Sequence, residues 1–178
     1  MRTIEVPPST ITIKQGDITR EAVDIIVTAA NSRLMGGGGV DGAVHRAAGP
    51  KLLYECKRLR QEKGLVDPGS AVLTGPGNLK IKFVIHAVGP VWQGGGSDER
   101  KTLMSAYENA LNLAVKANVK SIAFPSISTG SYSYPIDFAA PAAIEAIKTF
   151  LKGCESPLDV RLILFTEADY KTYDNYLK

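Results

Sequence analysis

A glycine-rich stretch that ends in a carboxylate is the part of this sequence best suited to chemistry. Four consecutive glycines, Gly36–Gly39, are followed by Val40 and Asp41. Glycines let backbone N–H groups point at a ligand, and a helix that begins behind them adds partial positive charge, so this combination favours phosphate binding. Asp41 is unusual there because a carboxylate repels a nearby phosphate. Two interpretations are open: Asp41 caps the following helix, or it is a general base that activates a water.

Two further polar segments follow predicted strands. Asn31 precedes the glycines, and its amide is either an ordinary turn residue or a group that orients a substrate hydroxyl or the water. A second serine- and glycine-containing loop, Ser126–Ser131, follows another strand. A third glycine group is Gly94–Gly96. Because ligands of open α/β sheets bind outside the carboxyl ends of the strands, we expect all three glycine groups on one rim.

Known nucleotide and metal motifs do not explain these residues. A P-loop requires Gly-Lys-Ser/Thr, but Gly42 is followed by Ala43. The spacing of Gly37, Gly39 and Gly42 matches the dinucleotide fingerprint formally, yet it is separated from the strand and no acidic residue ends the next strand. His45 and His86 belong to no ligand-spaced cluster, and both are interpreted as packed core histidines. We therefore expect neither a cofactor nor a metal ion.

Hydrophobic periodicity predicts alternating strands and helices. The predicted strands cover residues 11–14, 23–27, 71–74, 82–87, 121–124 and 160–165. Predicted helices run from Asp41 to Arg60 with a break at Gly49–Pro50, from a Ser97 cap to Ala117, and from near Asp137 to Leu151. This order indicates one α/β domain spanning residues 1–178, with its sheet between helical layers.

Composition restricts the class of protein. The 178 residues are 44% hydrophobic and 22% charged with a net charge of +3, which excludes a disordered chain and is too weak to indicate nucleic-acid binding. The basic run Lys57–Lys63 is interpreted as a solvated helix face. Neither a membrane helix nor a signal peptide is expected, and Cys56 and Cys154 are expected to be reduced thiols. We expect a cytoplasmic monomer.

Several blocks of the sequence, taken in order, resemble the macro domain family. They are Gly16–Thr19, Ala29–Asn31, Gly36–Gly49, Val84–Trp92 and Ser126–Tyr132. The long central block is similar to the MacroD-type group in particular. The resemblance covers about residues 11–176 and implies a three-layer α/β/α fold with a mixed, mostly parallel sheet. It also implies binding of ADP-ribose, and hydrolysis of O-acetyl-ADP-ribose or removal of mono-ADP-ribose from acidic side chains of proteins.

The resemblance assigns roles to individual residues. It implies that Asn31 and Asp41 are the catalytic pair. By the same likeness, Asp17 accepts a hydrogen bond from the adenine amino group, the Ile18 N–H contacts that ring, and Phe165 flanks it. The remaining expected contacts, to the diphosphate and the distal ribose, come from Gly38, Gly39, Val40, Ser128, Thr129, Gly130, Ser131 and Tyr132. The expected partners are ADP-ribose, its esters and mono-ADP-ribosylated proteins.

Two departures from the family pattern bear on activity. Thr28 stands where asparagine is usual, which alters a supporting hydrogen bond, and Ser131 stands where a small apolar residue is common. Asn31 and Asp41 are both present and favour an enzyme. The alternative is a non-catalytic module that only binds ADP-ribose, and a turnover assay separates the two.

Overall fold

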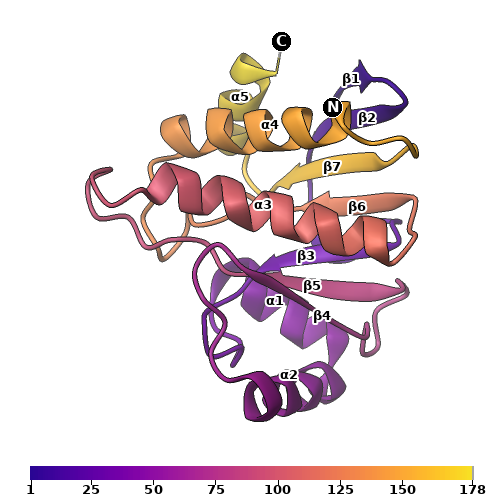
Figure 1. Ribbon diagram of the computed structural model, residues 1–178, viewed down its shortest axis with the longest axis vertical. Helices are drawn as coiled ribbons and strands as arrows, with labels where there is room; N and C mark the ends of the chain where they lie inside the picture. Colours follow the sequence, from indigo (N-terminus) through magenta and orange to yellow (C-terminus); the bar gives the residue numbers. More distant parts are fainter. Residues whose placement is uncertain (178) are drawn as a thin grey trace.

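The computed structural model describes residues 1–177 and contains a seven-stranded mixed sheet (Figure 1). The strands are β1 (Arg2–Val6), β2 (Ser9–Gln15), β3 (Ile25–Ala29), β4 (Ala71–Thr74), β5 (Phe83–Ala87), β6 (Ser121–Phe124) and β7 (Asp159–Leu164). Their order across the sheet is β1-β2-β7-β6-β3-β5-β4. The five central strands are parallel, and the edge strands β1 and β4 pair antiparallel with β2 and β5.

Helices cover both faces of the sheet, which confirms the predicted three-layer α/β/α architecture (Figure 1). The helices are α1 (Gly39–Ala48), α2 (Pro50–Lys63), α3 (Glu99–Lys116), α4 (Ile136–Lys152) and α5 (Glu167–Tyr176), with a short 3-10 turn η1 at Ile18–Arg20. Helices α3 and α4 lie on one face and α1 and α2 on the other. Helix α5 packs against α4 and β2.

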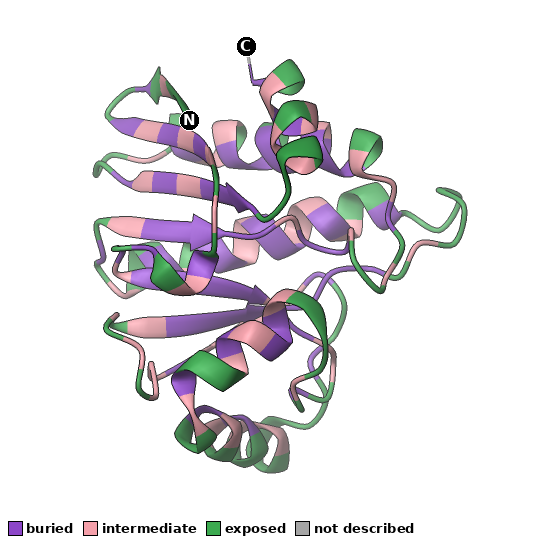
Figure 2. Cartoon of the chain, turned by 180° about the vertical axis from the view of Figure 1, so that it is seen from behind, coloured by how far each residue is buried: buried purple, intermediate pink, exposed green. Residues whose placement is uncertain are grey.

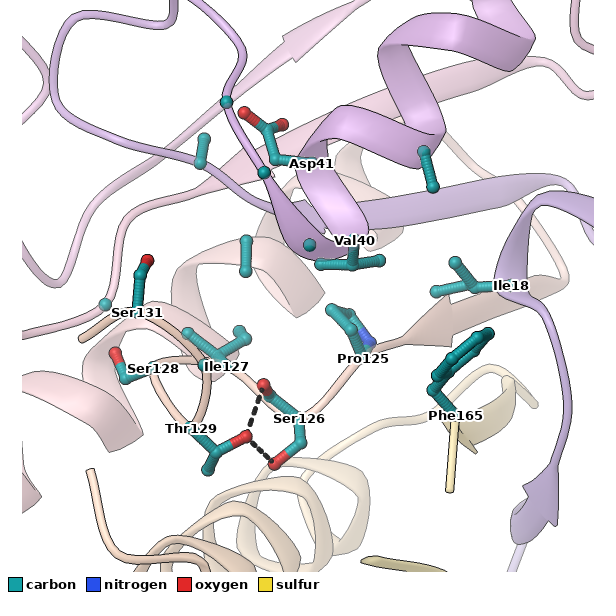
Figure 3. Close-up of a pocket in the computed structure, with 18 of the residues that line it drawn as sticks. Ile18, Val40, Asp41, Pro125, Ser126, Ile127, Ser128, Thr129, Ser131 and Phe165 are labelled. Atoms are coloured by element: carbon teal, nitrogen blue, oxygen red, sulfur yellow. Dashed lines mark hydrogen bonds between the residues drawn. The ribbon is translucent and has the colours of Figure 1, made fainter. Parts of the chain in front are cut away.

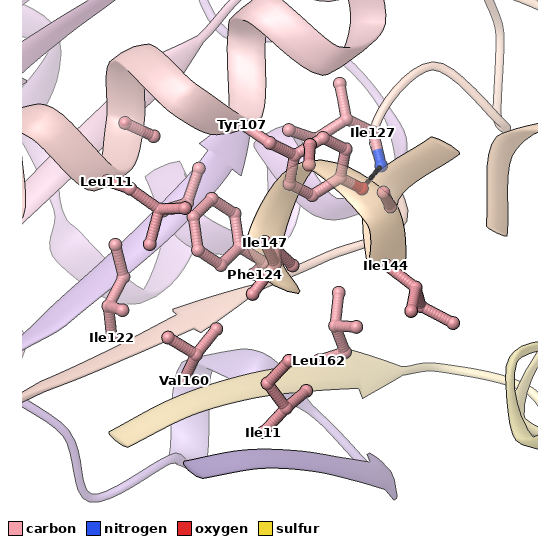
Figure 4. Close-up of a cluster of buried hydrophobic side chains, with 14 of the residues drawn as sticks. Ile11, Tyr107, Leu111, Ile122, Phe124, Ile127, Ile144, Ile147, Val160 and Leu162 are labelled. Atoms are coloured by element: carbon pink, nitrogen blue, oxygen red, sulfur yellow. Dashed lines mark hydrogen bonds between the residues drawn. The ribbon is translucent and has the colours of Figure 1, made fainter. Parts of the chain in front are cut away.

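Side-chain alternation along the parallel strands supplies apolar groups to both layers. In β3, Ile25 and Val27 belong to the core under α3 and α4, whereas Ile26 belongs to the core under α1 and α2. Strands buried on both faces are therefore nearly continuous apolar runs, as the sequence predicts. Figure 2 shows these strands as the most buried part of the molecule, and Figure 4 shows the larger core around Tyr107, Phe124 and Leu162.

The same alternation places polar side chains where the site needs them. Thr28 follows Val27 in β3 and is turned toward the α1 side, as is His86 in β5. Both are fully buried. Polar groups in such a position need hydrogen-bond partners, because an unpaired buried group is costly. The residues that these two side chains contact are described below.

Several local predictions differ from the structure. Helix α3 is not capped by Ser97: it begins at Glu99 behind Asp98, whose φ is 58° and whose side chain makes no cap hydrogen bond. Helix α4 begins at Ile136, so Pro141 lies inside the helix beyond its first turn. Strand β1 and helix α5 were not anticipated. Within residues 1–177, no helix is long and apolar enough to cross a membrane.

Candidate functional site

A cleft of about 710 Å³ opens at the carboxyl ends of the parallel strands. Segments that follow β2, β3, β5, β6 and β7 all line it, as expected for an open α/β sheet. Its volume suits a ligand of nucleotide size. The structure places every predicted site residue along this cleft: Asp17, Ile18, Asn31, Gly38, Gly39, Val40, Asp41, Ser128, Thr129, Gly130, Ser131, Tyr132 and Phe165. Figure 3 shows Ile18 and Phe165 at one end and Ser131 toward the other.

The first glycine loop forms one wall of the cleft and leads directly into α1. Gly36 and Gly39 have φ values of 76° and 58°, a region that only glycine enters without strain. Gly37, Gly38 and Gly39 have no neighbouring atoms where a Cβ would point, so the backbone is open to a ligand. The first N–H groups of α1 lack partners within the helix and face the same space. This wall therefore offers backbone donors and a positive helix end to an anion.

Close contact between α1 and this loop depends on a further glycine. A Cβ on Gly42 would collide with the carbonyl oxygen of Gly37. Glycine at this position lets the first turn of the helix lie directly against the loop, which fixes the loop relative to the helix end.

Asn31 holds the loop in shape. Its Nδ2 donates to the carbonyl oxygen of Gly36 at 2.9 Å, and its Oδ1 accepts from the backbone N–H of Arg33 at 3.1 Å. These bonds match the turn interpretation. An asparagine amide carries two N–H donors, so one remains for a ligand in the cleft. Asn31 therefore combines a structural contact with a position on the cleft wall.

Asp41 is held from behind by Thr28. Thr28 Oγ1 donates to Asp41 Oδ1 at 2.8 Å, and His45 Nε2 lies 3.6 Å from the same oxygen. The alternative interpretation of Asp41 as a helix cap is wrong, because α1 begins at Gly39 behind Gly38 without a side-chain cap. Burial raises the pKa of Asp41, and the Thr28 hydrogen bond and the nearby His45 ring oppose that rise. A carboxylate with a raised pKa is a stronger base at neutral pH.

The second loop, residues 125–129, is anchored by two buried tyrosines. Tyr107 of α3 donates to the carbonyl oxygen of Pro125 at 3.2 Å and accepts from the Ile127 N–H at 3.1 Å. Tyr173 of α5 shares a 2.8 Å hydrogen bond with Ser126 Oγ. Thr129 Oγ1 donates back to Ser126, as Figure 3 shows. Helices from elsewhere in the chain therefore fix the shape of this loop.

Ser128 is the strained residue of this loop. Its φ is 68°, it is buried, and its Oγ has no hydrogen-bond partner within residues 1–177. A Cβ on Gly89, two residues beyond β5, would collide with that oxygen and with Ile127. Gly89 thus permits a close approach between the two strand ends, and it was not recognised from the sequence.

The opposite end of the cleft carries an aromatic ring and a carboxylate. Phe165 directly follows β7 and is 80% exposed. It is therefore not a core residue. Asp17 Oδ1 accepts from Thr19 N and Oγ1 at 2.9 and 2.7 Å. These hydrogen bonds lower the pKa of Asp17, which keeps it ionised. Asp169 of α5 also lines this end and was missed because its helix was missed.

The third glycine group does not reach the cleft, contrary to the expectation of one common rim. Gly95 and Ser97 N–H groups donate to the buried Glu99 carboxylate at 2.6 and 2.7 Å, which closes this loop onto α3. Trp92, at the start of the loop, donates its backbone N–H to the Tyr132 carbonyl oxygen at 2.9 Å. The Gly94–Gly96 loop therefore supports the Tyr132 end of the neighbouring cleft wall indirectly.

Comparisons with known proteins agree with this geometry. A protein of Enterobacter sp. (strain 638) named O-acetyl-ADP-ribose deacetylase is 51% identical over 167 residues, which are 94% of this chain and 93% of the relative. The structure of an Oceanobacillus iheyensis macrodomain mutant with ADPR has a TM-score of 0.95 and 40% identity and covers 99% of this chain and 96% of that one.

A Trypanosoma brucei macrodomain in complex with ADP-ribose is more distant. It has a TM-score of 0.86 and 37% identity, over 94% of this chain and 69% of that one. The model of the Macro domain family matches residues 27–143, the segment that contains both loops and Asp41. This chain belongs to the macro domain family.

Proposed function

We propose that this protein binds ADP-ribose in the cleft and hydrolyses ADP-ribosyl esters, namely O-acetyl-ADP-ribose and mono-ADP-ribose attached to acidic side chains of proteins. Relatives named O-acetyl-ADP-ribose deacetylase and macrodomain structures with ADP-ribose support the ligand and the activity. The strongest single observation is Asp41, a buried carboxylate on the cleft wall that is oriented by Thr28.

The two ends of the cleft suit the two ends of this ligand. The adenine lies beside Phe165, with its amino group donating to the Asp17 carboxylate and the ring accepting from the Ile18 N–H. Both Thr19 bonds fall on Asp17 Oδ1, which leaves Oδ2 for the amino group. The diphosphate lies between the Gly38–Val40 wall and the Ser128–Ser131 loop and accepts from their backbone N–H groups. Tyr132 and Asn31 contact the distal ribose.

Hydrolysis requires an activated water beside the distal ribose. Asp41 accepts a proton from this water, and its raised pKa suits it to that step. Thr28 keeps the carboxylate turned toward the cleft, and the free Asn31 N–H holds a ribose hydroxyl. The water attacks the ester carbonyl and breaks the acyl C–O bond, or, where the carboxylate is attached at the anomeric carbon, it attacks that carbon and breaks its C–O bond. Either route releases ADP-ribose and the carboxylic acid, and Asp41 serves as the base in both.

A module that only binds ADP-ribose is the alternative. The position of Asp41 argues against it, because a carboxylate next to the diphosphate weakens anion binding. The same carboxylate is useful when a water must lose a proton. Its burial and its hydroxyl partner also keep it in one orientation, which simple binding does not require.

Asp41→Ala separates the two possibilities. The test measures release of ADP-ribose from an ester-linked mono-ADP-ribosylated protein by intact mass, and ADP-ribose affinity by calorimetry. We expect turnover to fall by about 10²–10⁴-fold while ADP-ribose still binds. Asp137→Ala, which removes an exposed carboxylate of α4 away from the cleft, is the matched control. Equal turnover by Asp41→Ala and the unmodified protein would refute the proposed role.

A further inference from the structure

Behind the cleft, three side chains that are far apart in the sequence meet in a buried cluster. His45 of α1, Cys56 of α2 and His86 of β5 each offer one ligand atom, and these atoms lie within 4.8 Å of one another. Cys56 and His86 are fully buried, whereas 14% of the His45 side chain is exposed. Histidine nitrogen and cysteine sulfur are the ligands that Zn²⁺ prefers. We propose that this cluster binds a thiophilic divalent cation of the Zn²⁺ type.

Thr74 engages one of the two ring nitrogens of His86. Thr74 Oγ1 donates to the Gly75 carbonyl oxygen at 3.1 Å, so at its 2.9 Å contact with His86 Nε2 it accepts. The proton of the His86 ring is therefore on Nε2, and Nδ1 carries a free lone pair. A metal-bound histidine usually coordinates through one ring nitrogen and donates the N–H of the other to a neighbouring group. Burial lowers the pKa of His86 to about 3, which keeps the ring neutral and able to coordinate.

The spacing is close to that of a tetrahedral site. Bond lengths of about 2.3 Å to sulfur and about 2.05 Å to nitrogen place those two ligand atoms about 3.6 Å apart at a tetrahedral angle. Cys56 Sγ lies 3.9 Å from His86 Nδ1 and 3.8 Å from His86 Nε2, so the separation is close to the required one. The near-equal distances place the sulfur beside the ring and not in front of the Nδ1 lone pair, so the His86 ring must turn for both residues to share a cation. His45, the least buried of the three, must also swing inward. Water completes the fourth position.

Asp41 connects the cluster to the cleft wall. His45 Nε2 lies 3.6 Å from Asp41 Oδ1, and Asp41 lines the cleft. The His45 ring also lies next to Gly36, whose φ value and missing side chain leave room beside it. A cation that enters past Asp41 meets a carboxylate first and then the three ligands.

Loading the site involves one proton. The Cys56 S–H bond breaks, the thiolate sulfur bonds to the cation, and the proton leaves to solvent. Burial and the nearby carboxylates of Asp41 and Glu55 raise the pKa of Cys56 to about 12, so the free protein holds this residue as a thiol. The same negative surroundings that disfavour a thiolate alone favour it together with a divalent cation.

Co²⁺ titration of the protein tests the proposal without any activity assay. We expect sulfur-to-cobalt charge-transfer absorption and the intense visible bands of a tetrahedral site, both removed by one equivalent of Zn²⁺. Cys56→Ser should abolish the charge-transfer band, and Cys154→Ser, which changes the other cysteine, should leave it intact. Thr74→Val should weaken Co²⁺ binding by about 10–100-fold, because it frees the His86 ring.

Two outcomes would overturn the proposal: no charge-transfer band in the unmodified protein, or a band that survives in Cys56→Ser. Far-UV circular dichroism checks that Cys56→Ser is folded, and Cys56→Ala replaces it if it is not.

A second readout rests on the proposed hydrolase function. A cation held by His45 lies beside Asp41, whose Oδ1 is 3.6 Å from His45 Nε2, and attracts that carboxylate away from the water, so Zn²⁺ should slow ester hydrolysis in the unmodified protein and in Cys154→Ser but not in Cys56→Ser. The absorption bands do not depend on turnover. A protein that shows them but hydrolyses no ester would retain the metal site and lose only the proposed function. Zn²⁺ inhibition that is equal in all three proteins would contradict inhibition through this cluster.

Discussion

Replacing Thr28 with valine removes the hydroxyl that orients Asp41 while keeping the shape of the buried side chain. The lost contact is a 2.8 Å hydrogen bond to a carboxylate at a position with no solvent exposure. Hydrogen bonds to charged groups contribute about 1.5–3 kcal/mol. Because one pKa unit corresponds to about 1.4 kcal/mol, the pKa of Asp41 should rise by a further 1–2 units or so.

The assay is the pH dependence of kcat/KM for O-acetyl-ADP-ribose hydrolysis. In Thr28→Val the acid limb should move to higher pH by about 1–2 units, so that activity below the new pKa falls by about 10–100-fold. ADP-ribose affinity should stay the same, since Thr28 is not among the residues that line the cleft. Thr28→Ser keeps the hydroxyl and loses only a methyl group, so its acid limb should stay in place.

Stability gives an independent check with a defined sign. Burial raises the pKa of Asp41 in the folded chain, so ionisation of Asp41 destabilises the fold. That cost is absent well below pH 3.8, the usual value, and grows as pH rises through the folded pKa. Thr28→Val should therefore lose up to about 1.5–3 kcal/mol of unfolding free energy at neutral pH and much less in acid. An unmoved acid limb in folded Thr28→Val, or an equal shift in Thr28→Ser, would refute this account.

Three further predictions concern the two loops and the ring at the end of the cleft. Gly89→Ala should weaken ADP-ribose binding at least tenfold by calorimetry, because its Cβ displaces the Ser128 loop. Gly96→Ala is the control, because a Cβ at Gly96 would contact no neighbouring atom. Equal losses of affinity in the two variants would contradict the reasoning. Phe165→Ala should cost about 1–3 kcal/mol of ADP-ribose binding through lost stacking while Tm stays unchanged, since the ring is 80% exposed; an unchanged Kd would remove Phe165 from the adenine site. Glu99→Gln should loosen the Gly94–Gly96 loop and alter fluorescence from Trp92, the only tryptophan; an unchanged spectrum with bound and free ligand would argue against this support.

The central fold could be predicted because its strands are buried on both faces. The largely apolar runs at residues 121–124 and 160–164 have apolar side chains on both faces of the strand, and these are buried only when a helical layer covers each face of the sheet. Helix α5 escaped prediction because Tyr173 is its only buried residue, so it lacks an apolar stripe. A signal was nevertheless present: Thr166 accepts from the Asp169 N–H, the first half of a capping box. Strand β1 is an exposed edge strand with little periodic pattern.

The candidate site could be located from motif order, but its contacts could not. Thr28 was recognised only as a departure from the family pattern, and the structure shows its hydroxyl bonded to Asp41. That pairing depends on the direction in which β3 and the first turn of α1 face each other, which spacing does not encode. The cluster of His45, Cys56 and His86 was missed for the same reason, since residues on two helices and a strand meet only in the folded chain.

The two tyrosines behind residues 125–129 also determine when the entropy cost of ordering this loop is met, during folding or during ligand binding. Tyr107 and Tyr173 fix this loop from α3 and α5 before any ligand arrives. The backbone N–H groups of this loop are thus ordered during folding, and little conformational entropy remains to be lost when a ligand binds. A site of this kind recognises its ligand by rigid backbone geometry, and its affinity depends on residues of the hydrophobic core that the ligand never touches.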